Sequence, residues 1–254
     1  MDESNNKTKS VRLRLVCCGA KLYLREKCRC ALSNSQSQSH GFIFENEIRK
    51  KVFELQEESN DTNIHDIPCS KNKFDFNENI SIKTTGSSTI CCGDILRFYQ
   101  YDFNHKNTII CIQYEQIEDS KQIKHIFEIN YNRECHQKLF GNITKTEIQQ
   151  YVNSVKSIPQ NIPREDIIKT FDYKTEKNTL MNNKNMNIQI NPKIDSKNQR
   201  RVQCSISNFE RTLEKFITYK SAIETPNVIR GKHITSTIDS STRVRKISTI
   251  STHG

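Results

Sequence analysis

The 254-residue sequence contains no tryptophan and only seven glycines, and it has no long hydrophobic run. No stretch approaches the roughly 20 apolar residues that a helix needs to cross a bilayer. The most apolar part of the N-terminal region, "VRLRLVCCGAKLYL", is interrupted by charge too often to form the core of a signal peptide. We therefore expect no membrane span, and a soluble, intracellular protein of the cytoplasm or the nucleus.

Cysteine pairs of the CxxC type are also absent, although the chain has ten cysteines. Without a signal peptide, and in a chain of this length, reduced thiols are a better interpretation than a disulfide scaffold. Soft ligands do gather near the N-terminus, at Cys17, Cys18, Cys28, Cys30 and His40. Their spacing matches structural zinc sites poorly, so buried free thiols are the favoured interpretation of this cluster.

Positive charge is concentrated at the two ends of the sequence. Residues 1–40 hold eight Lys/Arg against three Asp/Glu, and residues 193–254 hold twelve against five, whereas residues 41–192 are close to neutral. Basic segments on both sides of a near-neutral centre suit a protein that binds a polyanion and also has a cation-binding site in its centre. The alternative is that these charges only keep the surface soluble.

Apolar spacing predicts one clear helix at 42–55, where Phe44, Ile48 and Val52 recur along a single face. Glu45 borders that face and could either be a surface residue or reach into a site. The other expected elements are strands at 63–67, 79–85, 107–117, 123–131 and 201–206, a helix or turn at 92–101, and helices at 133–140, 145–158 and 209–217.

This order of elements predicts an α/β (α+β) core at 41–171, with a mixed central sheet flanked by helices. Basic extensions lie on both sides of it. Residues 1–40 include a helix that resembles the first helix of a SAP-type DNA-binding module, without a recognisable second helix. Beyond the core we expect a mobile linker at 172–192, a basic DNA-recognition element at 193–225 and a Ser/Thr-rich basic tail at 226–254, which is disordered from residue 235 onward unless DNA orders it.

A possible catalytic pattern lies in the segment "DIPCSKNKFDFNENISIKTTGS". Hydrolysis of a phosphodiester with Mg²⁺ needs carboxylates to hold the cation and a lysine near the water or the phosphate. Asp66 lies on one expected strand, and Ser81 and Lys83 lie on the next with the two-residue spacing that puts side chains on one face. Asp75 and Glu78 are rival acids whose polar surroundings favour a loop. A surface lysine in a chance D...SxK spacing is the alternative.

The pattern resembles the PD-(D/E)xK nuclease superfamily, from "SHGFIFENEIRKKVF" through "HDIP" and "NISIKTTGS" to "QRRVQCSI". The resemblance covers residues 40–220 and is strongest to type II restriction endonucleases of large DNA viruses and bacteria. It implies a restriction-endonuclease-like core, with Glu45 and Asp66 as Mg²⁺ ligands and Lys83 as the catalytic lysine. Ser81 departs from the family, which has a carboxylate there, and would support water or metal through its hydroxyl.

Two groups of residues are expected to contact DNA. Thr84, Thr85 and Ser87 follow the catalytic pattern and could bind phosphates, with Gly86 allowing close backbone approach. The second group combines phosphate-neutralising lysines with side chains that read guanine and adenine edges: Lys193, Lys197, Arg200, Arg201 and Gln203. A solvated basic loop is the alternative for this group.

The sequence therefore predicts a Mg²⁺-dependent, site-specific endonuclease of double-stranded DNA. The resemblance also implies a homodimer and a cognate DNA methyltransferase that acts separately. The alternatives are a structure-specific repair or recombination nuclease, and an inactive DNA-binding protein derived from a nuclease. Ser81 is the main argument for the inactive protein.

Overall fold

The structure is a computed structural model that describes residues 41, 43–56, 64–195 and 198–239. The chain divides into two compact units, Met1–Ile43 and Phe44–Gly254, and the description below concerns the second unit. The N-terminal helix that resembles a SAP-type module, and the cluster of Cys17, Cys18, Cys28, Cys30 and His40, lie outside the described residues.

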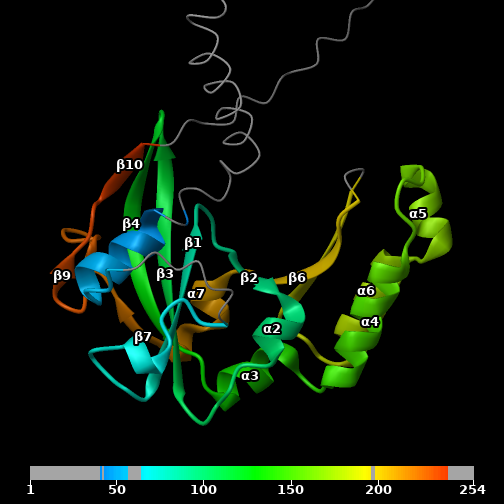
Figure 1. Ribbon diagram of the computed structural model, residues 1–254, viewed down its shortest axis with the longest axis horizontal. Coiled ribbons are helices and arrows are strands. Elements are labelled where there is room, and N and C mark those ends of the chain that lie inside the picture. The colour runs from blue at the N-terminus through cyan, green and yellow to red at the C-terminus, as the bar shows by residue number, and fades with distance from the viewer. Residues whose placement is uncertain (1–40, 42, 57–63, 196–197, 240–254) are drawn as a thin grey trace, which may run out of the picture. The chain divides into compact units, whose positions relative to one another are not determined.

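A five-stranded mixed sheet forms the centre of the second unit (Figure 1). Its strands are β1 (Glu78–Thr85), β3 (Lys106–Ile117), β4 (Ser120–Asn130), β7 (Ile217–Lys220) and β10 (Thr237–Asp239). β1 runs parallel to β3, β3 and β4 form an antiparallel hairpin, and β4 also pairs antiparallel with β7 and β10. The predicted mixed α/β class is confirmed, and β1 is left at one edge of the sheet.

Alternation along β1 separates the two faces of the sheet. Ile80 and Ile82 point to one side, where they meet Ile48 and Val52 in a buried apolar cluster. The helix formed by residues 43–47 and its continuation, the π-helix η1 (Ile48–Val52), cover this side. The predicted helix at 42–55 is therefore present over most of its length, and its last turn is wound more loosely than an α-helix.

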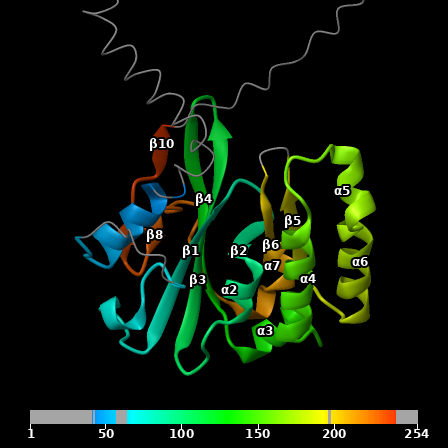
Figure 2. The ribbon, with the colours of Figure 1, turned by 45° about the vertical axis from the view of Figure 1, so that its right-hand side comes forward.

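The opposite side of the central sheet contacts a second, antiparallel sheet and most of the helices (Figure 2). This second sheet contains β2 (Ile90–Asp94), β6 (Arg200–Ile206) and β5 (Gln189–Ile194). The helices are α2 (Ile95–Tyr99), α3 (Arg133–Phe140), α4 (Lys145–Ser157), α5 (Arg164–Thr170) and α6 (Tyr173–Asn183). α4 packs against β6, and α6 packs beside β5. The larger of the two apolar cores lies between these layers.

Local capping signals place two of the helices. The side chain of Thr144 accepts a hydrogen bond from the backbone of Glu147, and Glu147 accepts one from the backbone of Thr144, which is the capping box expected at the start of α4. Asp94 accepts from the backbone N–H of Arg97 at 3.0 Å and so caps α2.

Two of the sequence predictions are wrong in the middle of the chain. Residues 64–66 form a bend, and only Ile67 bridges to β1, so the strand expected at 63–67 is reduced to a single bridge. The linker expected at 172–192 instead contains α6 and the beginning of β5. Because β5 pairs with β6, the basic segment at 193–225 is part of the same unit and not a separate module.

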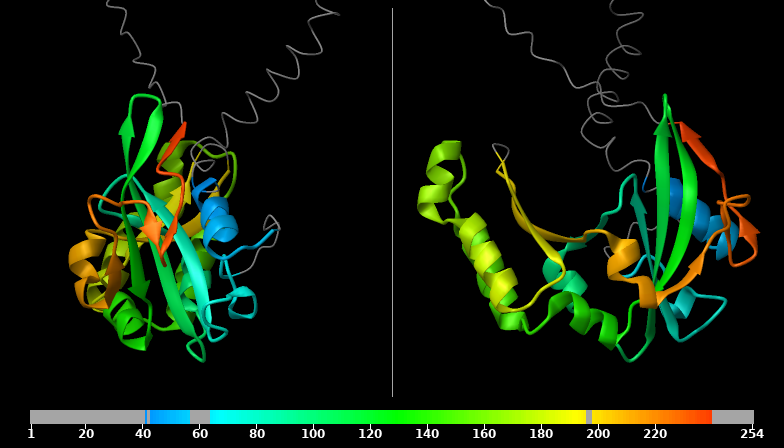
Figure 3. Two further views of the ribbon diagram at one scale, coloured as in Figure 1. Left: turned by 90° about the vertical axis from the view of Figure 1, so that its left-hand side faces the viewer. Right: turned by 180° about the vertical axis from the view of Figure 1, so that it is seen from behind.

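The C-terminal region also differs from expectation. The helix predicted at 209–217 is short: α7 (Phe209–Thr212) is followed by the 3₁₀ turn η3 (Glu214–Phe216) and then by β7. In the expected tail, β8 (Val228–Ile229) and β9 (Lys232–His233) form a small hairpin, and β10 pairs with β4 at the edge of the central sheet (Figure 3). Residues 240–254 lie outside the described part of the chain.

Arg230, in the turn of that small hairpin, fastens the C-terminal region to the sheet. Its guanidinium donates to both oxygens of Glu78 at 2.9 and 3.1 Å and to both oxygens of Glu128 at 2.9 and 3.0 Å. Glu78 is fully buried, and these bonds compensate for the loss of its hydration. The tail beyond residue 226 is therefore ordered by a specific ionic contact as far as β10.

Membrane spans were sought among the helices of the described residues. None of these helices is both long enough and apolar enough to cross a bilayer.

Candidate active site

The candidate site lies at the exposed edge of β1, where the side chain of Asp66 accepts a backbone hydrogen bond that a neighbouring strand would otherwise accept. Ile67 and Ile80 exchange two backbone hydrogen bonds, at 3.0 and 2.8 Å. The chain before Ile67 then leaves the sheet, and the next outward N–H of β1, that of Ile82, donates to Oδ2 of Asp66 at 2.5 Å. The carboxylate of Asp66 is therefore held by the edge of the sheet and not by the strand predicted around it.

Lys83 brings its amine to the same carboxylate. Its Nζ lies 3.4 Å from Oδ2 of Asp66 and donates to the carbonyl oxygen of Ile82 at 3.1 Å. Burial alone would lower the pKa of Lys83, but Asp66 outweighs it with smaller help from Tyr101 and Cys92, so this pKa stands above its ordinary value. Lys83 is therefore an ammonium ion at neutral pH, suited to binding anionic oxygen and not to removing a proton.

Glu45 completes the group from the helix on the other side of the edge. Burial and, to a smaller extent, the negative charge of Asp66 raise the pKa of Glu45 to about 7, although Lys83 and Arg49 partly oppose the shift. Glu45 is half-buried. Two acids and a lysine predicted from the sequence therefore influence one another electrostatically, and near neutral pH about half of Glu45 carries a proton.

Arg49 is a residue of this site that the sequence interpretation missed. It is 4% exposed and donates from Nη1 to the backbone carbonyl of Asp66. Arg49 lies four residues after Glu45, on the same helix face. It thereby joins the helix to the segment that presents the carboxylate of Asp66.

Ser81, at the position where the family that the sequence resembles has a carboxylate, lies on the same side of β1 as Lys83, and its hydroxyl bonds into the core. It is 1% exposed, its hydroxyl lies 2.8 Å from the hydroxyl of Tyr101, and Nδ1 of His65 lies 3.3 Å away. Burial lowers the pKa of His65 to about 4 and raises that of Tyr101 to about 12. Both partners are therefore neutral at physiological pH, and the sequence interpretation named neither of them.

The rival acids have other roles. Oδ1 of Asp75 accepts from the backbone N–H of Asn77 at 2.8 Å and so closes a turn. Glu78 binds Arg230, Lys106 and Thr108, and although burial by itself would raise the pKa of Glu78, these donors lower it to about 2. The interpretation of Asp75 as a loop residue is confirmed. The same interpretation of Glu78 is wrong, because Glu78 is the first residue of β1 and its side chain forms the buried ionic contact with Arg230.

The predicted phosphate-binding residues lie in the turn after β1. The hydroxyl of Thr85 donates to the carbonyl of Thr89 at 2.7 Å and accepts from the backbone N–H of Ser87 at 3.1 Å. The side chain of Ser87 in turn accepts from the N–H of Thr89 at 3.1 Å. Thr84 is half-buried at the end of β1. Thr85 and Ser87 thus shape the turn, and their contact with DNA stays a prediction.

The predicted recognition residues are divided between structure and surface. Lys193 and Arg201 are exposed and lie opposite each other on β5 and β6, with the half-buried Gln203 two residues further along β6. Arg200 instead donates to the carbonyls of Ile158 at 3.0 Å and Pro159 at 2.6 Å, beyond the C-terminal end of α4. Lys197 lies outside the described residues.

The residues at the edge of β1 include the types of oxygen ligand that a magnesium ion takes. Within the described ranges, no group of three or more His, Cys, Asp or Glu side chains could hold a metal. Mg²⁺ is, however, usually bound through one or two carboxylates together with waters and substrate phosphates. Asp66 and Glu45 supply two carboxylates, and the carbonyl of Ile82 adds a neutral oxygen, so this set fits Mg²⁺ better than it fits zinc.

Comparisons of the chain with protein-family models, curated proteins and solved structures found no match.

Proposed function

We propose that this chain is a Mg²⁺-dependent, site-specific endonuclease of double-stranded DNA, with a core of the PD-(D/E)xK type. The observation that carries the proposal is the ion pair of Asp66 and Lys83 at one edge of the sheet, whose charges also act on Glu45. Carboxylates and an ammonium ion side by side are suited to binding a cation and the anionic oxygens of a phosphodiester together.

Each residue has a distinct task in this proposal. Asp66 and Glu45 would hold Mg²⁺, and Glu45 would lose its proton as the ion binds. When bound, the metal supplies Lewis-acid activation of the phosphate and of a nucleophilic water. Lys83, which keeps its positive charge, stabilises the charge that develops on the phosphate oxygens and does not act as the general base. Arg49 fixes the backbone from which Asp66 projects.

Exposed side chains would bring the duplex to this site. Lys193 and Arg201 supply positive charge on adjacent strands, which favours binding to phosphates, and Gln203 can donate to and accept from a base edge. Charge of this kind makes DNA binding sensitive to salt, which a binding titration at several salt concentrations would measure.

Plasmid cleavage tests the proposal. We expect wild-type protein to cut supercoiled plasmid in Mg²⁺ and not in EDTA, and Lys83→Ala to reduce the rate about 100-fold or more, as the loss of an electrostatic stabiliser does in other enzymes. Lys124→Ala is the control, because Lys124 is exposed on β4 and pairs only with exposed Glu115 among the described residues. Equal nicking by all three proteins, with and without EDTA, would reject the proposal.

A second candidate, a DNA-binding protein without nuclease activity, is favoured by the environment of Ser81. Its hydroxyl bonds with Tyr101 and His65 inside the core, so the position that normally supplies a carboxylate contributes no charge to the site. Salt-sensitive binding to duplex DNA with no cleavage in either Mg²⁺ or Mn²⁺ would support this candidate over the endonuclease.

A further inference from the structure

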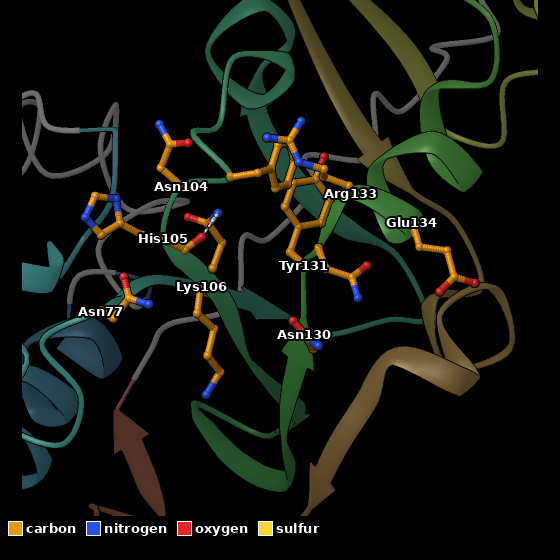
Figure 4. Close-up of a pocket in the computed structure, with 11 residues that line it drawn as sticks. Asn77, Asn104, His105, Lys106, Asn130, Tyr131, Arg133 and Glu134 are labelled. Atoms are coloured by element: carbon orange, nitrogen blue, oxygen red, sulfur yellow. Dashed lines mark hydrogen bonds between the residues drawn. The ribbon is translucent and has the colours of Figure 1, made fainter.

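A polar cavity of about 530 Å³ opens where β1, β3 and β4 meet the loops at one end of the central sheet (Figure 4). Three separate parts of the chain line it: Asn77 just before β1, residues 103–107 leading into β3, and residues 130–134 between β4 and α3. This volume falls within the range of sites for small organic ligands. The cavity lies apart from Asp66 and Lys83, which do not line it.

Amide groups dominate the lining of this cavity. They come from Asn77, Asn104, Asn107, Asn130 and Asn132. Asn107 is buried and donates to the carbonyl of Asp102 at 2.7 Å, whereas within the described part of the chain the side chains of Asn77 and Asn130 make no hydrogen bond. An amide presents a donor and an acceptor side by side, which is the pattern that complements the edge of a nucleobase.

One positive charge at the cavity has no acidic partner among the described residues. The guanidinium of Arg133 lies 5.5 Å from the ring centre of Phe103 and forms no ion pair in that part of the chain. Its neighbour Glu134 turns away (Figure 4) and binds Lys215. Lys106 is already paired with Glu78 at 2.9 Å. The cavity therefore favours a ligand with one anionic group next to a planar polar group.

We propose that this cavity binds one nucleotide, with the base among the asparagine amides and the phosphate on Arg133. The ligand could be a nucleotide of the DNA strand or a free mononucleotide, because both present the same base and phosphate. If it belongs to the DNA strand, the inference rests on the proposed nuclease function and identifies an additional contact with the substrate.

Packed aromatic rings connect the cavity with the core beneath the candidate active site, and the distance between the two is compatible with one DNA strand contacting both. The ring of Tyr131, which lines the cavity, lies 5.4 Å from the ring of Tyr101, whose hydroxyl bonds with Ser81. Glu78 pairs with Lys106 at the cavity, and Lys83 lies five residues further along β1. Five residues of extended strand correspond to about 17 Å between the cavity and Lys83. A DNA strand advances by this distance in about five nucleotides of B-form rise.

Binding titrations of the full-length protein in EDTA test the inference without cleavage. The probes are dAMP, a fluorescent single-stranded oligonucleotide and inorganic phosphate. We expect Arg133→Ala to weaken nucleotide binding about tenfold or more, because a charge-assisted hydrogen bond is lost, and exposed Asn77→Ala to weaken it a few-fold. Arg211→Ala, which removes an arginine from a different cavity beside Ser88 and Asn208, should bind as the wild type does.

Each outcome decides the inference. Binding of dAMP that depends on Arg133 indicates a free-nucleotide site, and binding of the oligonucleotide alone, with the same dependence, indicates a contact with the substrate strand. Equal binding by Arg133→Ala and Arg211→Ala, with circular dichroism showing that both are folded, would overturn it. So would inorganic phosphate that binds as tightly as dAMP. Because these binding measurements in EDTA involve no cleavage, and Arg133→Ala leaves Asp66 and Lys83 unchanged, failure of the cavity and failure of the nuclease are distinguishable.

Discussion

Replacing Arg230 by methionine should destabilise the protein strongly, because Arg230 alone bridges two carboxylates below the central sheet. The variant keeps a long apolar side chain but removes four contacts of 2.9 to 3.1 Å to Glu78 and Glu128. Glu78 is 1% exposed and Glu128 is 14% exposed. Their charges would therefore remain largely buried without this partner.

The expected loss can be estimated from the pKa of Glu78. Burial tends to raise this pKa, yet Arg230, Thr108 and Lys106 lower it from 4.5 to about 2. At about 1.4 kcal/mol per pKa unit, this difference corresponds to about 3 kcal/mol of stability at neutral pH. Removing one partner of a buried ion pair in other proteins costs roughly 3–5 kcal/mol. We therefore expect Arg230→Met to lower the free energy of unfolding by about 3 kcal/mol.

Urea unfolding followed by circular dichroism measures this loss, since the chain has no tryptophan for fluorescence. The control is Lys124→Met, which breaks an exposed pair with Glu115 and should cost less than about 1 kcal/mol. Because the folded-state pKa of Glu78 is lowered, its stabilisation is present above about pH 4.5 and disappears as the pH falls toward 2. A loss no larger than that of the control, or one that does not shrink in acid, would refute this reasoning.

Three further predictions concern the site and the helices. In EDTA, Glu45→Gln should raise the melting temperature at pH 8 but not at pH 4. The pKa of Glu45 is raised in the folded protein, so ionisation of Glu45 destabilises the fold as the pH rises from 4.5 through about 7. Thermal unfolding at both pH values checks this. Tyr101→Phe removes a bond to buried Ser81 and should lower the free energy of unfolding by about 1 kcal/mol, with no change greater than a few-fold in any plasmid nicking. Thr144→Ala should cost about 1 kcal/mol in urea unfolding through loss of the cap of α4, and an unchanged midpoint would contradict it.

Elements with strong local signals were predictable from the sequence. The apolar spacing of Phe44, Ile48 and Val52, the isoleucine-rich segments of β3 and β4, and the Thr144 cap of α4 all depend on residues close together in the chain. The apolar patterns indicate which side chains are buried, and the cap indicates where a helix begins, so each predicts the local structure. The mixed class of the sheet follows from the order of these elements.

The irregular linker expected at 172–192 shows where composition misleads. Asn, Lys and Thr dominate α6, and none of its residues is fully buried. The helix nevertheless begins at the cap Asp172 and packs Leu180 and Met181 against the larger core. Contacts with distant residues therefore stabilise a segment whose own sequence has little helical preference.

The candidate site was predictable only in part. Asp66 and Lys83 form an ion pair, and their charges shift the pKa of Glu45, but Asp66 is positioned by a bond to Ile82 across the sheet edge, which no local pattern specifies. Tyr101 follows Lys83 by eighteen residues and reaches the site only through the crossover between β1 and β3. The signal for Arg49 was present, because it lies four residues after Glu45 on the same helix.

The most direct test of the proposed function is the single-turnover cleavage rate of duplex DNA at saturating protein, compared between wild type and Asp66→Asn as Mg²⁺ is titrated. Asparagine keeps the size of the side chain and an oxygen that can accept from Ile82, but it removes the charge that would hold the cation. We predict a rate that rises with Mg²⁺ in the wild type and stays near zero in Asp66→Asn. Equal rates in the two proteins, or cleavage that does not respond to Mg²⁺, would contradict a metal-dependent nuclease at this site.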